Sequence, residues 1–170
     1  MIAQSGTADI VIFETGGAVC ALARQDVRAI LPLPNLWRPP ELPAPVEGFF
    51  NLGGSAVPVL ALARLFRLPA TDAPETIYRH LVLPRVQGSS QVAFLVDRVR
   101  DITAAPSDGF LAVDETRTLN GCVEFEISID GALVHVLSVE RILMAKERDT
   151  LDALYGMAQS RLSEWSAVTP

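Results

Sequence analysis

The sequence predicts a mainly β protein built from two small barrels in tandem and followed by a C-terminal α-helix. Three observations predict this class. Short apolar runs of strand length alternate with turn signals along most of the chain. Two sets of these runs recur in the same order, which is typical of a duplicated unit. The last stretch of the chain instead carries apolar residues at helical spacing.

Each expected strand is an apolar run bounded by turn-forming residues. The expected strands are Asp9–Glu14, Ala18–Ala23, Val27–Leu31, Val57–Leu60, Arg79–Pro84, Gln91–Val96, Val99–Thr103, Val123–Ile129 and Ala132–Leu137. Hairpin turns are expected at Thr15-Gly16-Gly17, Gly88-Ser89-Ser90 and Asp130-Gly131.

The rest of the chain is organised around the stretch Pro43–Leu68. Its expected order is a proline loop, a turn at Gly48, the apolar pair Phe49-Phe50, a break at Gly53-Gly54, a strand and a helical turn over Leu62–Leu68. Two adjacent glycines allow the backbone positive φ without a Cβ clash. Pro58 donates no ladder hydrogen bond, so its strand must be an edge or a bulge at that point.

The connections between the strands are rich in proline. Residues 32–45 hold six of the twelve prolines, so this loop is expected to be stiff and extended. Trp37 in its middle is expected to fold onto the core, and an exposed anchor for a partner is the alternative. Pro69–Glu75 is expected to be a linker-like turn, and Ala104–Thr118 an irregular polar connection.

The C-terminal part is expected to be helical. Ser138 can cap a helix that begins near Val139. Because Lys146–Asp149 interrupts the apolar pattern, a separate amphipathic helix is expected over residues 149–165. Its stripe consists of Leu151, Leu154, Ala158, Leu162 and Trp165. The stripe is expected to dock on the protein's own barrel, and contact with a partner helix or a second copy is the alternative.

Composition excludes several classes of function. A net charge of −6 argues against binding to phosphate backbones, which needs clustered Lys and Arg. The longest uncharged run, Gly48–Ala63, has 16 residues broken by Gly and Pro, whereas a membrane span needs roughly 20 apolar residues. No signal-peptide pattern is seen, so a cytoplasmic protein is expected. Cys20 and Cys122 are expected to be reduced core residues.

Two pairs of segments match across the chain. Gly17–Ile30 resembles Ser89–Ile102 at an offset of 72 residues, and Val57–Phe66 resembles Val134–Leu143 at an offset of 77. Half-units with about five short strands bury their apolar faces best by curling into barrels. A groove between two such barrels would be lined by apolar residues of both. The expected lining residues are Val27, Ile30, Val99 and Ile102.

The sequence lacks the motifs of common enzymes. His80 and His135 lie in separate strands, and no cluster of His, Cys and Asp has zinc spacing. No nucleophile elbow, P-loop or dinucleotide fingerprint occurs. Gly53-Gly54-Ser55 lacks a following helix start and a lysine, so no phosphate site is expected there. We therefore expect no catalytic, cofactor-binding or metal-binding residues, and an enzyme remains only as an alternative.

Four motifs occur in a fixed order along the chain. They are Val27-Arg28-Ala29-Ile30; Gly48 with Asn51-Leu52-Gly53-Gly54 and Val57-Pro58-Val59-Leu60-Ala61-Leu62; Asp97-Arg98-Val99-Arg100-Asp101-Ile102; and Asp130-Gly131 with Val139-Glu140-Arg141-Ile142-Leu143. Together they resemble the CheW family, the adaptors that couple chemoreceptors to the chemotaxis histidine kinase. The resemblance covers roughly residues 9–155.

The resemblance implies two five-stranded SH3-like barrels, at about residues 9–75 and 76–143, with strands that can swap between the halves. It implies a non-catalytic scaffold of a two-component chemosensory pathway, located in the cytoplasm at receptor arrays on the inner face of the membrane. The cytoplasmic tip of a chemoreceptor, a methyl-accepting protein, would bind in the groove between the barrels. The regulatory domain of a CheA-type histidine kinase would bind at the barrel ends.

The resemblance also implies contact residues. By position, the receptor groove would be shaped by Val27, Ile30, Gly48, Val99 and Ile102. Further candidate contacts are Leu52, Gly53, Gly54 and Trp37.

Three positions depart from the family pattern. Ala29 stands where the family has Glu, Gly53 where it has Arg, and Ala61 where it has Asp. That Glu and Arg look like ion-pair partners, and losing one alone would cost on the order of 3–5 kcal/mol if buried. Losing both leaves no unpaired charge. The alternative function is therefore a divergent module that self-associates through its C-terminal helix, or recruits another effector through that helix or the Pro32–Pro45 loop.

Overall fold

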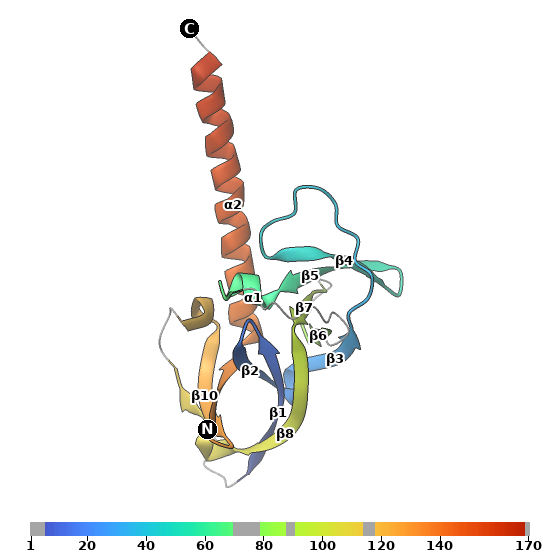
Figure 1. The fold of residues 1–170 in the computed structure, drawn as a ribbon, viewed down its shortest axis with the longest axis vertical. Helices are drawn as coiled ribbons and strands as arrows, with labels where there is room; N and C mark the ends of the chain where they lie inside the picture. The colour runs from blue at the N-terminus through green and yellow to red at the C-terminus, as the bar shows by residue number, and fades with distance from the viewer. Residues whose placement is uncertain (1–5, 70–78, 88–90, 114–117, 169–170) are drawn as a thin grey trace.

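The structure is a computed structural model that describes residues 6–69, 79–87, 91–113 and 118–168. Two curled β-sheets lie side by side, and a long C-terminal helix rises from them (Figure 1). The protein is thus mainly β, with tandem SH3-like barrels and a C-terminal helix, as the sequence predicts. The expected linker Pro69–Glu75, from residue 70 on, and the expected turn Gly88-Ser89-Ser90 lie outside the described residues.

The first barrel has six strands in the spatial order β8-β1-β2-β11-β10-β9. Their bounds are β1 Thr7–Thr15, β2 Ala18–Ala23, β8 Arg98–Pro106, β9 Leu111–Ala112, β10 Val123–Ile129 and β11 Ala132–Leu137. Neighbours are antiparallel except β2 and β11, which are parallel. Short 3-10 turns, η3 Ser107–Gly109 and η4 Thr118–Gly121, lie beside β9 and before β10.

The second barrel has five strands in the order β3-β6-β7-β5-β4. Their bounds are β3 Val27–Pro32, β4 Val46–Leu52, β5 Ser55–Ala61, β6 His80–Pro84 and β7 Ala93–Val96. The 3-10 turn η1 (Arg24–Asp26) precedes β3, and α1 (Leu62–Leu65) follows β5. Past β3 the chain pairs with β4 through Trp37 and Phe49, whose backbone N–H groups each donate to the other's carbonyl at 2.8 Å.

Both barrels have the same order of strands when the repeat is taken into account. If the five strands of each sequence repeat are numbered in chain order, with the short β9 left out, both sheets contain the third strand, a hairpin, the fifth strand and the fourth strand, side by side in that order. The hairpin of each sheet comes from the other repeat. The β1–β2 hairpin lies between β8 and β11, and the β6–β7 hairpin lies between β3 and β5. The two repeats therefore exchange hairpins.

Irregularities in the strands recur at matching positions of the two repeats. Arg28 is the extra residue where β3 shifts register against β6, and Arg100 is the extra residue where β8 shifts against β1. Glu47 in β4 and Glu124 in β10 occupy equivalent bulges. Bulges at equivalent places are expected of a duplicated unit, since they set where each strand bends.

The core has three apolar clusters. One fills the first barrel, one fills the second, and the largest lies between them and reaches both helices. Strand β1 shows how this arises, because Ile10 and Ile12 enter the first barrel while Val11 and Phe13 enter the central cluster. Both faces of β1 are thus buried, which explains its continuous apolar run.

Several predictions about individual elements were wrong. Gly48 is not a turn but lies inside β4, where the Glu47 bulge bends the strand. The segment Ala104–Thr118 is not wholly irregular, because β8 continues to Pro106 and β9 follows. Pro58 is tolerated as expected, because the pairing of β5 with β7 begins only at Val59.

The C-terminal helix was also predicted wrongly in part. Residues 149–165 are helical, but as part of one helix, α2 (Val139–Val168). The charged residues from Lys146 to Asp149 break the apolar stripe without breaking the helix, since Lys, Glu and Arg favour helices. Where the structure describes its side chains, the stripe does not dock on the barrel: Leu151, Leu154 and Leu162 are 65, 55 and 60% exposed, and the side chain of Trp165 lies outside the described part. The second half of α2 extends beyond the barrels (Figure 1).

Candidate protein-binding site

A small cleft lies where β1 and β8 of the first barrel meet β3 of the second. It has a volume of about 100 Å³, and Val11, Val27, Ile30 and Ile102 are among its lining residues. Three of the five residues predicted for the groove, Val27, Ile30 and Ile102, are therefore brought together. The cleft lies between the barrels, where the sequence places the groove.

The pairing of the strands positions these side chains. Val11 and Ile102 are directly paired across β1 and β8. Val11 and Val27 are fully buried and form the floor, whereas Ile30 is partly buried and Ile102 is 48% exposed. A large aliphatic side chain left half in water beside an apolar hollow is a feature of binding surfaces. Burial of such a side chain by a partner contributes roughly 25 cal/mol per Å² of apolar area.

The two other predicted groove residues lie elsewhere. Val99 packs against the central cluster and is not among the residues that line the cleft. Gly48 lies beneath the segment from Leu36 to Arg38, where a Cβ would stand 2.9 Å from the carbonyl oxygen of Trp37. The structure thus gives Gly48 a structural reason to be glycine, because the backbone of Trp37 passes too close for a side chain.

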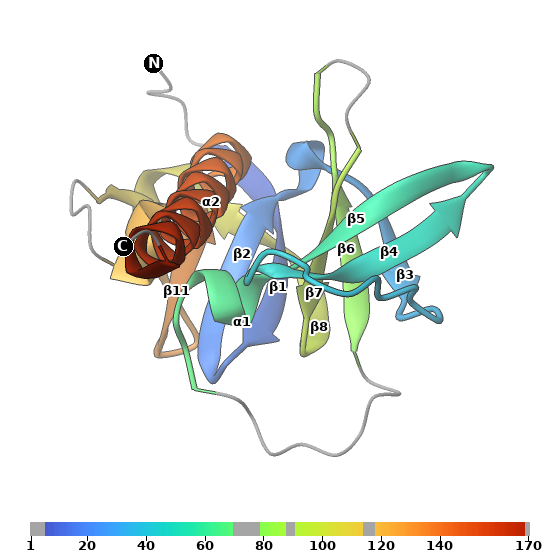
Figure 2. The same cartoon turned by 90° about the horizontal axis from the view of Figure 1, so that it is seen from above.

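The further candidate contacts gather at β4 of the second barrel. Gly53 and Gly54 form the β4–β5 turn with φ of +59° and +93°, as predicted, and Asn51 Oδ1 accepts a hydrogen bond from the Gly54 N–H at 2.8 Å. Leu52 is partly buried beside them. This hairpin projects from the second barrel on the side away from α2 (Figure 2).

Trp37 does not fold onto the core. Its side chain is 66% exposed and rests against Phe49, with ring centroids 5.8 Å apart. The prediction of burial was wrong because the backbone pairing of Trp37 with Phe49 holds the indole on the outer surface of β4. An exposed aromatic on a fixed backbone is suited to anchoring a partner.

Sequence reasoning missed part of the cleft. Val11, Arg24, Arg28 and Ala29 also line it. Val11 could have been found because side chains alternate between the two faces of β1, and Val11 lies on the face toward the central cluster. The two arginines gave no signal, because their approach to Ile102 depends on the pairing of strands far apart in the chain.

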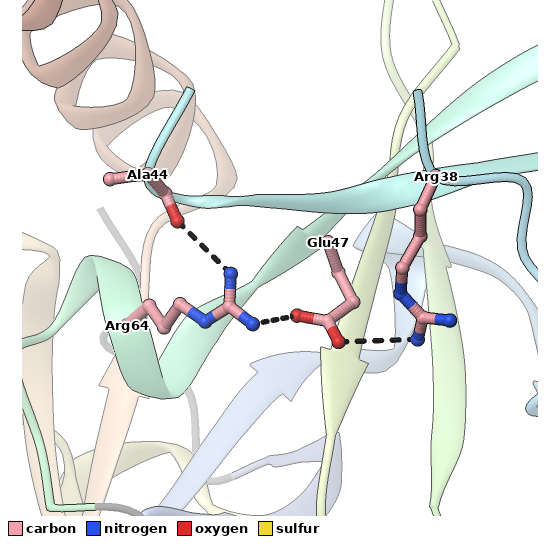
Figure 3. Close-up of polar contacts among 4 residues, drawn as sticks. All are labelled: Arg38, Ala44, Glu47 and Arg64. Carbon is pink, nitrogen blue, oxygen red and sulfur yellow. Dashed lines mark hydrogen bonds and ion pairs between the residues drawn. The ribbon is translucent and has the colours of Figure 1, made fainter. Parts of the chain in front are cut away.

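Ion pairs near the candidate contacts centre on Glu47. Its carboxylate accepts hydrogen bonds from Nη2 of Arg38, at 3.3 Å, and from Nη2 of Arg64 (Figure 3). Nη1 of Arg64 also donates to the carbonyl oxygen of Ala44 at 3.3 Å. Ala29, which replaces the family's Glu, lies in the cleft wall, and Gly53, which replaces its Arg, lies in the exposed β4–β5 turn. Glu47 of β4 therefore pairs with two arginines without involving either family position.

Both cysteines have strongly raised pKa values. Cys20 and Cys122 are free and buried in the central cluster, and burial raises the pKa of each thiol to about 12. Such thiols are poor nucleophiles, since the thiolate is the reactive form. Across the part of the chain that the structure describes, no group of three His, Cys, Asp or Glu could hold a metal ion. No helix among the described residues is long and apolar enough to span a membrane.

Comparison with known proteins agrees with the geometry. The family model described as "CheW-like domain" matches residues 9–147. The scaffolding protein TtCheW from Thermoanaerobacter tengcongensis has a similar crystal structure, with a TM-score of 0.70 at 18% identity, over 82% of this chain and 89% of that one. At this identity the likeness shows the fold alone. No curated protein sequence matches the chain.

Proposed function

Because the chain belongs to the CheW-like domain family, we propose that it is a non-catalytic adaptor that couples a chemoreceptor to a CheA-type histidine kinase. Membership of the family supports a coupling adaptor in general. The observation that carries the specific proposal is the apolar cleft between the barrels, with Ile102 half exposed at its rim. The cytoplasmic tip of the receptor would bind there, with the adaptor in the cytoplasm at the inner face of the membrane.

The kinase regulatory domain would bind a different surface. The exposed Trp37 and the β4–β5 hairpin with Leu52, Gly53 and Gly54 offer one at the end of the second barrel. A rigid indole and a projecting hairpin tip can insert into a complementary surface without the entropic cost of ordering a flexible segment. The two partners would then bind the same adaptor at once.

The receptor contact is tested by one substitution at the cleft and one matched substitution away from it. Ile102→Glu places a charge at the rim, whereas Leu133→Glu changes a comparable side chain on β11 that is 53% exposed. Binding of receptor tip fragments and of the kinase regulatory domain is measured by calorimetry. We expect Ile102→Glu to weaken receptor binding at least about tenfold, as for a central interface residue. Leu133→Glu should retain it, and both should retain kinase binding.

Two results would overturn this proposal. If the folded wild-type protein bound neither partner, the adaptor role would be rejected. If receptor binding occurred but Ile102→Glu and Leu133→Glu affected it equally, the receptor site would lie outside the cleft.

The second candidate function is self-association through α2. Leu151, Tyr155 and Leu162 are exposed on the free half of this helix, and with Ala158 they follow the alternating spacing of four and three residues found in two-stranded coiled coils. Removing residues 149–170 should convert a dimer into a monomer, measured by light scattering. A dimer that persisted after truncation would exclude this role for α2. The Pro32–Pro45 loop would then be the next surface to test for an unrelated effector.

A further inference from the structure

Three arginines lie around the cleft between the barrels. Arg24 and Arg28 line the cleft itself, Arg28 and Arg85 line a neighbouring hollow of about 260 Å³, and Arg24 and Arg85 line a third hollow of about 620 Å³. Each arginine is thus shared by two of the three hollows. The backbone N–H of Arg85 donates to the carbonyl oxygen of Asp26 at 2.8 Å, which fixes the end of β6 against η1 and brings the three together.

These three guanidinium groups have no ion-pair partner within the part of the chain that the structure describes. Each side chain is exposed, and among the described residues none of the three makes an ion pair. Arginines elsewhere do, as with Arg38 and Arg64 on Glu47, and Arg100 on Glu14. The one acidic side chain among the residues lining the three hollows is Asp9. The lining of the three hollows therefore carries more positive than negative side chains, in a chain whose net charge is −6.

The cleft between the arginines is small and apolar. A volume of about 100 Å³ corresponds to roughly three water molecules, which is the size of one aliphatic side chain. Val11 and Val27 supply its buried floor. The region thus combines room for a single aliphatic group with positive charge on its rim.

We propose that the occupant of this cleft is an acidic polypeptide segment, whose aliphatic side chain enters the cleft while flanking carboxylates pair with Arg24, Arg28 and Arg85. The inference rests on the proposed function insofar as a protein segment binds between the barrels, and it adds the chemistry of that segment. Arginine forks match carboxylates bidentately, so they select for geometry as well as charge. A nucleic acid fits less well, since the rim offers no aromatic stacking platform and the net negative charge opposes a phosphate backbone.

The test uses the full-length protein and two short helical peptides. One carries a single leucine flanked on both sides by glutamates, and its twin carries glutamines at those positions. Chemical shifts of the protein's amides are followed during titration. We expect the glutamate peptide to shift the amide signals of Arg24, Arg28 and Ile102. It should bind about tenfold more tightly than its twin, because several weak exposed charge pairs add together. Raising the salt to about 1 M, where the Debye length is roughly 3 Å, should remove most of this difference.

Two triple variants with the same change in charge complete the test. Arg24, Arg28 and Arg85 are changed to Gln in one, and Arg79, Arg98 and Arg161 in the other; the second three line none of the hollows and make no ion pair among the described residues. The first variant should lose the preference for glutamate, and the second should keep it. Equal binding of the two peptides, equal loss in both variants, or shifts that map outside the cleft would overturn the inference. So would cleft shifts caused by oligothymidine but not by the glutamate peptide.

Failure of this inference can be told apart from failure of the adaptor role. If a receptor tip fragment bound the wild-type protein and the Arg24, Arg28 and Arg85 variant equally well, the adaptor role would stand and the acidic partner would be rejected. If the glutamate peptide bound as expected and no receptor fragment did, the cleft would still select acidic segments and the receptor would not be its partner.

Discussion

Glu47, the bulged residue of β4, forms an ion pair with Arg64 of α1. This pair connects the bend in β4 to the helical turn that follows β5. The second repeat has a related contact, in which Arg141 of α2 donates Nη1 to the carbonyl oxygen of Val123 in β10 at 2.6 Å. In both repeats an arginine at the start of a helix reaches back to the fourth strand. The first repeat adds a carboxylate and a second arginine, Arg38.

Glu47→Gln should lower the stability of the fold modestly. The Glu47 side chain is only 13% exposed, but both arginine partners are more than half exposed, so solvent screens the pairs. We expect a loss of about 1 kcal/mol, measured from the midpoint of urea unfolding. Glu147→Gln on the exposed face of α2 is the control and should change stability by less than about 0.5 kcal/mol. Equal effects of the two changes would show that the Glu47 pairs contribute nothing.

Gly48→Ala should destabilise the second barrel. The new methyl group would stand 2.9 Å from the Trp37 carbonyl oxygen, which belongs to backbone that pairs with Phe49 and cannot move freely. We expect a loss of roughly 1–3 kcal/mol, as for overpacking. Gly156→Ala on α2 meets nothing within 4 Å and should instead stabilise by up to about 1 kcal/mol, because alanine favours helix. Thermal unfolding should show a lower midpoint for Gly48→Ala and a higher one for Gly156→Ala. An unchanged midpoint for Gly48→Ala would contradict the close approach of Trp37.

The thiols should make the folded state less stable in alkaline solution. An unfolded cysteine has a pKa near 8.5, whereas burial raises the pKa of Cys20 and Cys122 to about 12. Below the pKa of the unfolded state, both the folded and the unfolded protein keep the thiol protons, so the full stability of the fold is present. Between these pH values the unfolded chain binds fewer protons than the native one, so stability falls as pH rises, by up to about 1.4 kcal/mol per pH unit for each thiol. A variant with Ala at both positions should lack this part of the slope.

The same burial predicts slow chemical modification. A thiol reagent at mildly alkaline pH should label Cys20 and Cys122 only as fast as the protein opens, and immediately after urea is added. Rapid labelling of the native protein would contradict their place in the central cluster.

The distal half of α2 should tolerate substitution. Leu151→Ala removes a side chain that is 65% exposed and should change stability by less than about 0.5 kcal/mol in the monomer. Ile142→Ala, in the buried first turns of the same helix, should cost about 2–5 kcal/mol. Urea unfolding at low protein concentration compares them. A large cost for Leu151→Ala in the monomer would indicate that the free half of α2 docks after all.

Local sequence chemistry predicted the parts of the fold that depend on neighbouring residues. The Gly53-Gly54 turn needs two positive φ angles, which glycine provides, and Asp130-Gly131 forms a turn with φ of +51° and +80°. The duplication was visible because both repeats use the same apolar spacing. Val27, Ile30 and Ile102, three of the five residues that the sequence predicts for a groove, line the cleft between the barrels, and their assignment to a receptor site stays a prediction.

Features that depend on distant pairing were not predictable in this way. Trp37 is exposed because its backbone pairs with β4, and nothing in the proline-rich segment indicates that pairing. Arg24, Arg28 and Arg85, which make no ion pair in the described part of the chain, come together only when β6 packs beside η1. The sequence predicts a turn at Gly48 because glycine permits one, yet glycine is required there because a Cβ would stand 2.9 Å from the carbonyl oxygen of Trp37.

The exchange of hairpins has a consequence for how such a molecule can arise and be divided. One repeat unit alone would leave its hairpin without the flanking strands that the other unit supplies. Two identical units could supply each other's flanking strands in a symmetric intertwined pair. By the same reasoning, separately expressed N-terminal and C-terminal fragments should fold only when mixed.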